Sequence, residues 1–351
     1  MSDPRRSTGG RGKGEAALPN PLIAAMLMPG FYPHPCESVE LRHSLRSWLL
    51  FAGDRVYKIK KPVRFFFIDA TTPARRLALC RDEIELNRRL APEIYLGVQG
   101  VVATQNTYAL TTELAASEVT DFAIVMRRLP AERMLDRLLS KDAVNLTDVK
   151  LLASHLAAFH ACATTAKAQR WGSAQALYGL VGSLEEAQKL VADSLMRARL
   201  KQLQAHLRRY IISHRQSLDN RVRDGRVREG HGDLRCKSVC LTGDKIVIIN
   251  CADCSESRRY LDVAGDLASL IIDLELPKRS DLAQGLLEAY VLNTGDHQVP
   301  ELMKFYKCFQ ATWRGILQML TSLRPELPNI QRIAARGEAR QWLDLALEYA
   351  A

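Results

Sequence analysis

The sequence lacks any run of about eighteen apolar residues, the length a helix needs to cross a bilayer, so we expect no transmembrane segment. The N-terminal residues, 1–21, are basic but lack the apolar core of a secretory signal peptide. The chain is therefore predicted to be cytoplasmic, with no membrane partner. Residues 1–20, rich in Gly, Ser, Arg and Pro, are predicted to form a disordered basic tail.

Signatures of nucleic-acid binding are also missing. The sequence has no aromatic RNA-binding signature, no zinc-finger spacing, no recognisable DNA-reading motif and no P-loop of the form GxxxxGK[ST]. The net charge of +10 and the pI near 9.3 suit acidic partners such as nucleotides and phosphates, and a basic surface with no specific partner is the alternative.

With 351 residues, 47% of them hydrophobic, the chain can form one large bilobal domain or two ordinary ones.

Four of the eight cysteines lie close together in the sequence, as C-x3-C and C-x2-C separated by ten residues. These residues are Cys236, Cys240, Cys251 and Cys254. Two such pairs on one hairpin could bind zinc. Against this, Cys240 and Cys251 lie in apolar strand-like runs, where free cysteine is commonly a small buried hydrophobe.

A hairpin is predicted near the start of the chain. The apolar runs 47–52 and 55–60 flank a Gly-Asp pair, which is a typical turn between antiparallel strands. In the second run Lys58 and Lys60 alternate with apolar residues and therefore share one face. A lysine that points inward from a small sheet needs an anion. The alternative is an edge strand whose lysines are solvated.

A helix is predicted over residues 74–91, and it offers two acids as partners for such a lysine. Glu83 lies two turns before Leu90 on the same face, so it is preferred, and Glu85 is the fallback. Further strands are predicted at 98–104, 107–115 and 121–126. An irregular link follows the last of these, as expected for a hinge between two lobes.

The rest of the chain is predicted to be largely helical. Helices are expected over 147–166, 262–275, 281–293, 299–322 and 330–350. His155 and His160 are predicted to be core-edge and surface residues rather than ligands. A capping box at Ser183–Glu186 is predicted to begin a long amphipathic stretch that runs to about Arg223, with a break near 197–203. The fold class is therefore α+β, with a sheet lobe at 38–128 and a larger helical lobe at 129–351.

A His-Gly-Asp tripeptide at 231–233 opens the most informative stretch of the chain. It leads into a predicted hairpin, residues 229–254, and then into a helix that begins near Asp262 and Asp266. This layout is typical of a kinase-type active site.

Taken together, these motifs resemble the aminoglycoside phosphotransferase family, which has a protein-kinase-like fold. The resemblance covers about residues 40–325. It is carried by GDRVYKIKKPVRF, DEIELNRRLAPEIYLGV, VMRRLP with DRLL, VRDGRVREGHGDL and YLDVAGDLASLIIDLE. The chain is most similar to the domain that, in bacterial two-module proteins, precedes a P-loop ATP-binding module. That module is not expected here, because its motif does not occur in the sequence.

The resemblance implies a role for each matching residue. Asp233 would be the catalytic base that orients the acceptor hydroxyl, and His231 and Asp266 would be structural. Lys58 would hold the ATP phosphates with Glu83 as its partner, although the sequence does not decide between Lys58 and Lys60. The adenine would contact the backbone near Met126, Arg127 and Leu129. ATP and Mg²⁺ are the expected cofactors, and a small-molecule hydroxyl compound is the expected acceptor.

The chain departs from the family at the metal ligands. Ser238 stands where the family has Asn, Asn250 stands where it has the metal-binding Asp, and Arg235 replaces a His. Asp253 is the acid three residues beyond Asn250. Mg²⁺ prefers carboxylate oxygen, so the loss of a primary ligand would cost several kcal/mol in barrier, on the order of 10³-fold in rate.

Three hypotheses follow. The first is an ATP-dependent small-molecule kinase in which Asp253 takes over metal binding. The second is a pseudokinase that binds a nucleotide or a protein partner without efficient transfer. The third is a scaffold stabilised by zinc. The first two are favoured, with activity expected to be impaired, and the acceptor is not predictable from the sequence.

Overall fold

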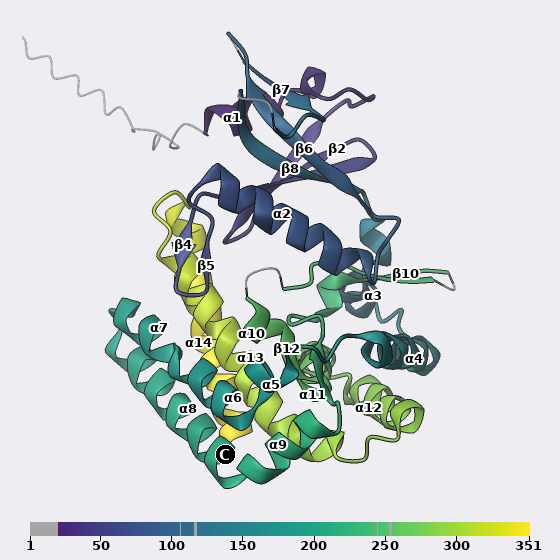
Figure 1. Cartoon of the computed structure of the whole chain (residues 1–351), viewed down its shortest axis with the longest axis vertical. Coiled ribbons are helices and arrows are strands. Elements are labelled where there is room, and N and C mark those ends of the chain that lie inside the picture. The colour runs from purple at the N-terminus through teal and green to yellow at the C-terminus, as the bar shows by residue number, and fades with distance from the viewer. Residues whose placement is uncertain (1–19, 106, 116–117, 244, 253–254) are drawn as a thin grey trace, which may run out of the picture.

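The computed structural model describes residues 20–105, 107–115, 118–243, 245–252 and 255–351. Nearly all of the predicted N-terminal tail lies outside these ranges. A sheet lobe lies above a larger helical lobe (Figure 1). The fold is α+β and bilobal, as predicted.

Six antiparallel strands form the sheet, in the order β1-β2-β3-β8-β6-β7. Their bounds are Val39–His43 (β1), Ser47–Ala52 (β2), Arg55–Lys60 (β3), Tyr95–Ala103 (β6), Tyr108–Thr111 (β7) and Val119–Arg127 (β8). The predicted hairpin is confirmed, since Ala52 pairs with Arg55 across the two-residue turn. Gly53 has a φ of +57°, and a side chain there would meet the Pro35 carbonyl at 2.7 Å, so glycine is required.

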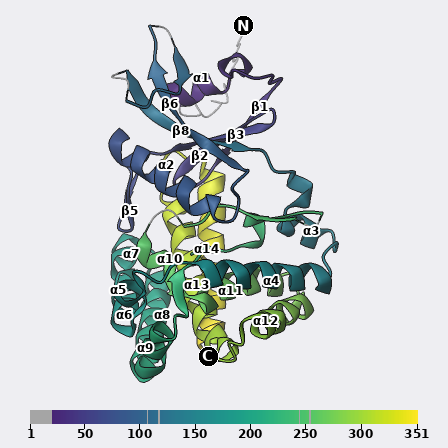
Figure 2. The ribbon, with the colours of Figure 1, turned by 45° about the vertical axis from the view of Figure 1, so that its right-hand side comes forward.

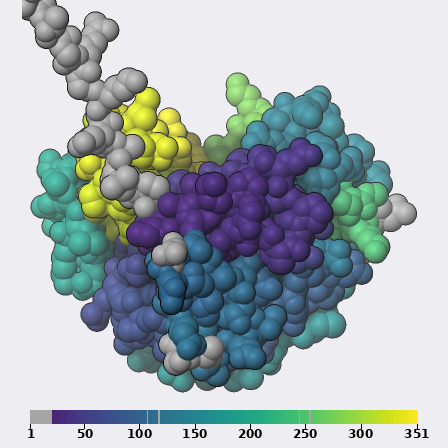
Figure 3. All heavy atoms as spheres, turned by 90° about the horizontal axis from the view of Figure 1, so that it is seen from above, coloured from purple at the N-terminus to yellow at the C-terminus, as the bar shows by residue number. Residues whose placement is uncertain are grey.

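Two helices cover opposite faces of this sheet. Helix α1 (Pro21–Met26) packs on one face against a cluster that includes Tyr57 and Ile59. Helix α2 (Pro73–Arg88) packs on the other face through Cys80 and Ile84. Because side chains alternate along β3, Lys58 and Lys60 point to the α2 face. Seen from above, the purple and blue segments of this lobe cover the centre of the molecule (Figure 3).

The second lobe is built from helices around one large apolar core. Its main helices are α3 (Leu135–Ser140), α4 (Leu146–Cys162), α5 (Ala168–Gly172), α6 (Ala174–Gly182), α11 (Val263–Glu275), α12 (Ser280–Thr294), α13 (Val299–Ser322) and α14 (Asn329–Ala350). Short strands β9 (Val227–Glu229) and β12 (Tyr260–Asp262) pair with each other, as do β10 (Val239–Thr242) and β11 (Lys245–Ile248). Helix α4 crosses below the sheet lobe, near α12 (Figure 2).

A short hairpin connects the two lobes. It consists of β4 (Arg64–Phe65) and β5 (Ile68–Asp69), immediately after the sheet strand β3. Its turn residues Phe66 and Phe67 pack edge-on against Trp313 of α13, with ring centroids 5.9 and 5.5 Å apart. Aromatic contacts of this kind fix the position of the sheet lobe over α13.

The amphipathic stretch predicted after Ser183 is largely helical, but the predicted position of its break is wrong. The stretch forms α7 (Leu184–Leu190), α8 (Ser194–Ser213) and α9 (Arg215–Arg223), and α8 runs unbroken through the expected break at 197–203. The capping box does not form, because the Ser183 hydroxyl donates to the Leu180 carbonyl at 2.7 Å instead. Asp193 caps α8 by accepting from two backbone amides, which explains where the chain restarts its helix. No helix in the described ranges is long and apolar enough to cross a membrane.

Candidate active site

Two lysines of β3 share one carboxylate of α2. The Nζ atoms of Lys58 and Lys60 lie 2.6 and 2.7 Å from the two carboxylate oxygens of Glu83. The side chains are 12%, 3% and 1% exposed, respectively. The structure places Lys58 beside Glu83 rather than beside the fallback Glu85, which is exposed.

The predicted adenine segment begins on the neighbouring strand. Met126 pairs with Val56 across β8 and β3, so its side chain lies on the same α2 face as Lys58. The Arg127 amide donates to the Ile94 carbonyl at 2.9 Å. Leu129 lies in the link to the helical lobe, after β8 ends. The three predicted residues therefore lie along the edge where the two lobes join.

The segment after β11 is attached to the sheet lobe. The backbone amide of Asn250 donates to the Tyr95 hydroxyl at 3.2 Å, and that of Cys251 donates to the Asn87 side chain at 3.0 Å. Asn87 in turn donates to the Glu83 carbonyl at 2.7 Å. Helix α2 thus connects Glu83 to Cys251, the residue that follows Asn250.

Asp266 anchors the loop that carries Asp233. Its carboxylate accepts from the backbone amides of His231 and Gly232 at 2.6 and 2.7 Å. The Asp233 amide donates to Nδ1 of His231, so the ring proton lies on Nε2, which donates to the Ile249 carbonyl at 3.0 Å. His231 and Asp266 thus hold the backbone that leads into Asp233.

His160 belongs to the same network and was missed. It is buried, 3.3 Å from the Asp266 carboxylate and 2.8 Å from the Tyr290 hydroxyl, so its predicted place at the core edge or on the surface is wrong. Its position in α4, one turn of helix beyond Leu156, follows the apolar pattern and was the available signal. The histidine links α4, α11 and α12 behind the loop.

The three predicted metal positions are only partly described. Ser238 is buried beside β10, and Asn250 follows β11 with a φ of +66°, a conformation that Asn and Asp tolerate. Asp253 lies outside the described residues. The remaining two positions offer a hydroxyl and an amide where Mg²⁺ prefers carboxylates, so the described residues do not fit a magnesium site of the usual kind.

The cysteine cluster is likewise only partly described. Cys236, Cys240 and Cys251 are buried and form no disulfide, and Cys254 lies outside the described ranges. Among the described residues, no three His, Cys, Asp or Glu side chains gather closely enough to hold a metal ion. Cys251 donates weakly to the Leu86 carbonyl at 3.8 Å, as a packed thiol does.

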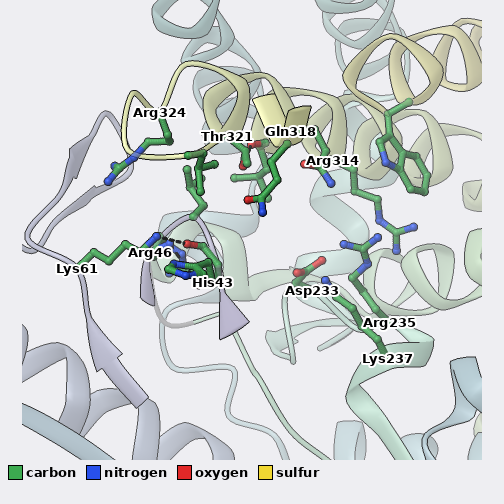
Figure 4. A pocket seen from close by; sticks show the side chains of 16 residues that line it. His43, Arg46, Lys61, Asp233, Arg235, Lys237, Arg314, Gln318, Thr321 and Arg324 are labelled. Carbon is green, nitrogen blue, oxygen red and sulfur yellow. Dashed lines mark hydrogen bonds between the residues drawn. The ribbon is translucent and has the colours of Figure 1, made fainter. Parts of the chain in front are cut away.

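A cleft of about 370 Å³ opens beside Asp233, between the two lobes (Figure 4). The turn between β1 and β2 and Lys61 form its upper side. The loop that follows Asp233, the C-terminal part of α13, the link from α13 to α14, and Gln331 and Trp342 of α14 form the rest. Lys58, Glu83 and Met126 are not among the residues that line it. Its cationic lining residues are Arg46, Lys61, Arg235, Lys237, Arg314 and Arg324.

An ion-pair cluster underlies the loop. Asp273 of α11 lies 2.5 Å from Arg314 and 3.8 Å from Arg235, and it also accepts from the Cys236 amide. Burial of the Asp233 carboxyl would raise its pKa, but Arg235, Arg314 and other cations outweigh burial and hold that pKa below its usual value. Asp233 is therefore ionised at neutral pH, and its carboxylate can act as a hydrogen-bond acceptor.

The fold and this arrangement define a kinase-like protein. A sheet lobe carries a lysine–glutamate pair, and a helical lobe carries an aspartate loop next to a cleft. The model of the phosphotransferase enzyme family matches residues 52–305. The chain belongs to this family, as its sequence motifs indicated.

Several relatives extend the comparison. Uncharacterized proteins of Mycobacterium tuberculosis and Mycobacterium bovis are 28% identical to the chain over 289 residues, covering 79% of the chain and 54% of each relative. The chain thus spans about half the length of the curated relatives it matches.

Two solved structures resemble the fold. A choline kinase from Cryptosporidium parvum is similar with a TM-score of 0.55 and 11% identity, covering 93% of both chains. A choline/ethanolamine kinase family protein from Mesorhizobium loti is similar with a TM-score of 0.48 and 12% identity, covering 93% of this chain and 97% of that one. At such identity the choline kinase supports the kinase-like fold alone.

Proposed function

We propose that this protein transfers the terminal phosphoryl group of ATP to a hydroxyl of a small molecule, with Asp233 as the catalytic base and with impaired activity. The observation that carries the proposal is that Asp233 lines the cleft between the lobes, on a loop held by Asp266. The cytoplasmic location predicted from the sequence would give the protein access to ATP.

Each residue has a defined task in this proposal. Lys58, fixed by Glu83, would bind the ATP phosphates from the α2 face, and the backbone near Met126, Arg127 and Leu129 would hold the adenine. The ionised Asp233 would accept a hydrogen bond from the acceptor hydroxyl, orient it toward the phosphorus atom and take its proton.

The reduced activity follows from Ser238 and Asn250. In this reaction class the metal neutralises phosphate charge, and it does so best when carboxylates hold it. Because the described residues do not supply those carboxylates, no step is assigned to Mg²⁺ here. The second candidate function, favoured by the same two residues, is a pseudokinase that binds nucleotide or a protein partner and transfers nothing.

Binding and turnover of ATP separate the two functions. Calorimetric titration of ATP with and without Mg²⁺, followed by an ATP hydrolysis assay, should give binding and slow turnover. The Asp233→Asn variant should still bind ATP, since it removes a negative charge near the phosphates, but it should lose turnover. Binding with no turnover in either protein would favour the pseudokinase. No nucleotide binding at all would exclude the kinase and a nucleotide-binding pseudokinase, and it would leave only a protein that binds a partner.

A further inference from the structure

The cleft beside Asp233 has an unusual excess of positive charge. Asp233 is the only acid among the described residues that line it, against six lysines and arginines. Among the described residues, Asp273 contacts Arg235 and Arg314, Glu326 contacts Arg324, and Glu338 accepts from Gln318. The cations that line the cleft still outnumber the acid that lines it.

The cations come from separate parts of the chain, and they are not all solvated surface residues. Lys61 and Arg314 are each 2% exposed, although both line an open cleft. The Lys61 amino group donates to the Ser44 carbonyl at 2.7 Å, which is a neutral partner. Burial, followed by the charge of the nearby Arg324, lowers its pKa to about 8.

Two of the cationic lining residues are arginines on elements next to Asp233. The guanidinium groups of Arg235 and Arg314 share Asp273 as an ion-pair partner, at 3.8 and 2.5 Å. Guanidinium groups bind carboxylate and phosphate in a planar, two-pronged geometry.

The cleft lies on the acceptor side of Asp233. The residues proposed to hold ATP, Lys58 and Glu83 among them, do not line it, whereas Asp233 does. A hydroxyl that contacts Asp233 from this cleft would therefore belong to the acceptor.

We propose that the acceptor of this site is an anionic hydroxyl compound, one that carries a phosphate or a carboxylate, and not a cationic amine. This inference rests on the proposed function, because it identifies the class of its acceptor. An anion would contact Arg235, Lys237 and Arg324 while its hydroxyl reaches Asp233. A quaternary amine or an aminoglycoside would instead bring positive charge against an excess of positive charge.

The binding of three small hydroxyl compounds that differ in charge tests the proposal directly. Glycerol 3-phosphate, glycerol and choline are titrated into the full chain, alone and in the presence of saturating ADP. We expect glycerol 3-phosphate to bind with and without ADP and to weaken as salt is added, and we expect glycerol and choline to bind at least tenfold more weakly. Choline binding as tightly as glycerol 3-phosphate would overturn the proposal.

Competition with ADP shows whether the positive charge of the cleft binds the nucleotide phosphates or the acceptor. If ADP displaces glycerol 3-phosphate completely, the positive charge serves the nucleotide phosphates and the acceptor proposal is wrong. ADP binding is measured in the same titrations, so a protein that binds glycerol 3-phosphate but never ADP contradicts the proposed function and not the anion site.

Substitution of Lys237, which is exposed, and Arg324, which is half-buried, locates the site at cations outside the apolar core. The double variant Lys237→Gln, Arg324→Gln should weaken glycerol 3-phosphate binding roughly tenfold or more, because each substitution removes a charge-assisted contact. Arg336→Gln, an exposed arginine of α14 outside the cleft, is the matched control and should leave binding unchanged. If the double variant and the Arg336→Gln control bind glycerol 3-phosphate equally tightly, the anion binds elsewhere and the proposal is overturned.

Discussion

Replacement of Glu83 by glutamine should destabilise the protein far more than the same change at Glu85. Glu83 is buried and neutralises two lysines whose amino groups are 2.6 and 2.7 Å away. Glutamine keeps the shape of the side chain, so no cavity forms and the loss is electrostatic. Removing one partner of a buried ion pair costs about 3–5 kcal/mol, because the remaining charge is left buried.

The loss is large in comparison with the usual stability of a folded domain, about 5–15 kcal/mol. It is measured as the shift of the denaturant midpoint. The slope of the transition should stay unchanged, because a changed slope would mean that the unfolding is no longer two-state or that the denatured state has changed. Glu85→Gln is the matched control, since Glu85 is exposed two residues away on the same helix, and its effect should stay within about 0.5 kcal/mol. If the two variants are equally stable, the lysine pair is not held by Glu83 and the reasoning fails.

Three further predictions concern the loop before Asp233. Asp266→Asn should cost about 2–3 kcal/mol, read from denaturant unfolding, because it weakens two hydrogen bonds to the amides of His231 and Gly232. The pKa of Asp266 is lowered, since burial is outweighed by its hydrogen bonds and by the nearby histidines, so its stabilisation holds above about pH 4 and is lost as pH falls through the lowered pKa. The stability of the Asn variant should therefore fall less on acidification, and an identical fall in both proteins would contradict the assignment. Gly232→Ala should abolish turnover and destabilise the fold, because φ is +81° and the new methyl group would lie 2.8 Å from a backbone carbonyl; a variant as stable as the parent would count against the loop geometry.

Local patterns predicted much of the sheet lobe. The Gly53-Asp54 turn between two apolar runs fixes the β2–β3 hairpin, and the alternation in β3 places Lys58 and Lys60 on one face. The preference for Glu83 over Glu85 followed from helical spacing, which decides which acid faces the sheet. These features depend on neighbours within a few residues, which is why the sequence alone is informative.

Features that depend on distant contacts could not be predicted in this way. The Ser183 side chain bonds back to Leu180 instead of capping α7, and the pattern of residues does not reveal that choice. The excess of positive charge in the cleft depends on the fold, because Arg46, Arg235 and Arg324 come from three different parts of the chain. Of these three arginines, only Arg235 indicated the positive charge from the sequence alone, because it replaces a His of the family.

The most direct test of the account is ATP turnover in a variant with the family's metal ligands restored. Ser238→Asn combined with Asn250→Asp returns an amide and a carboxylate to the two neutral positions, and Asp tolerates the left-handed backbone at 250. We predict Mg²⁺-dependent turnover that rises about tenfold or more over the parent and is lost when Asp233→Asn is added. Unchanged turnover in a folded variant that still binds ATP, or turnover that survives Asp233→Asn, would contradict the central claim.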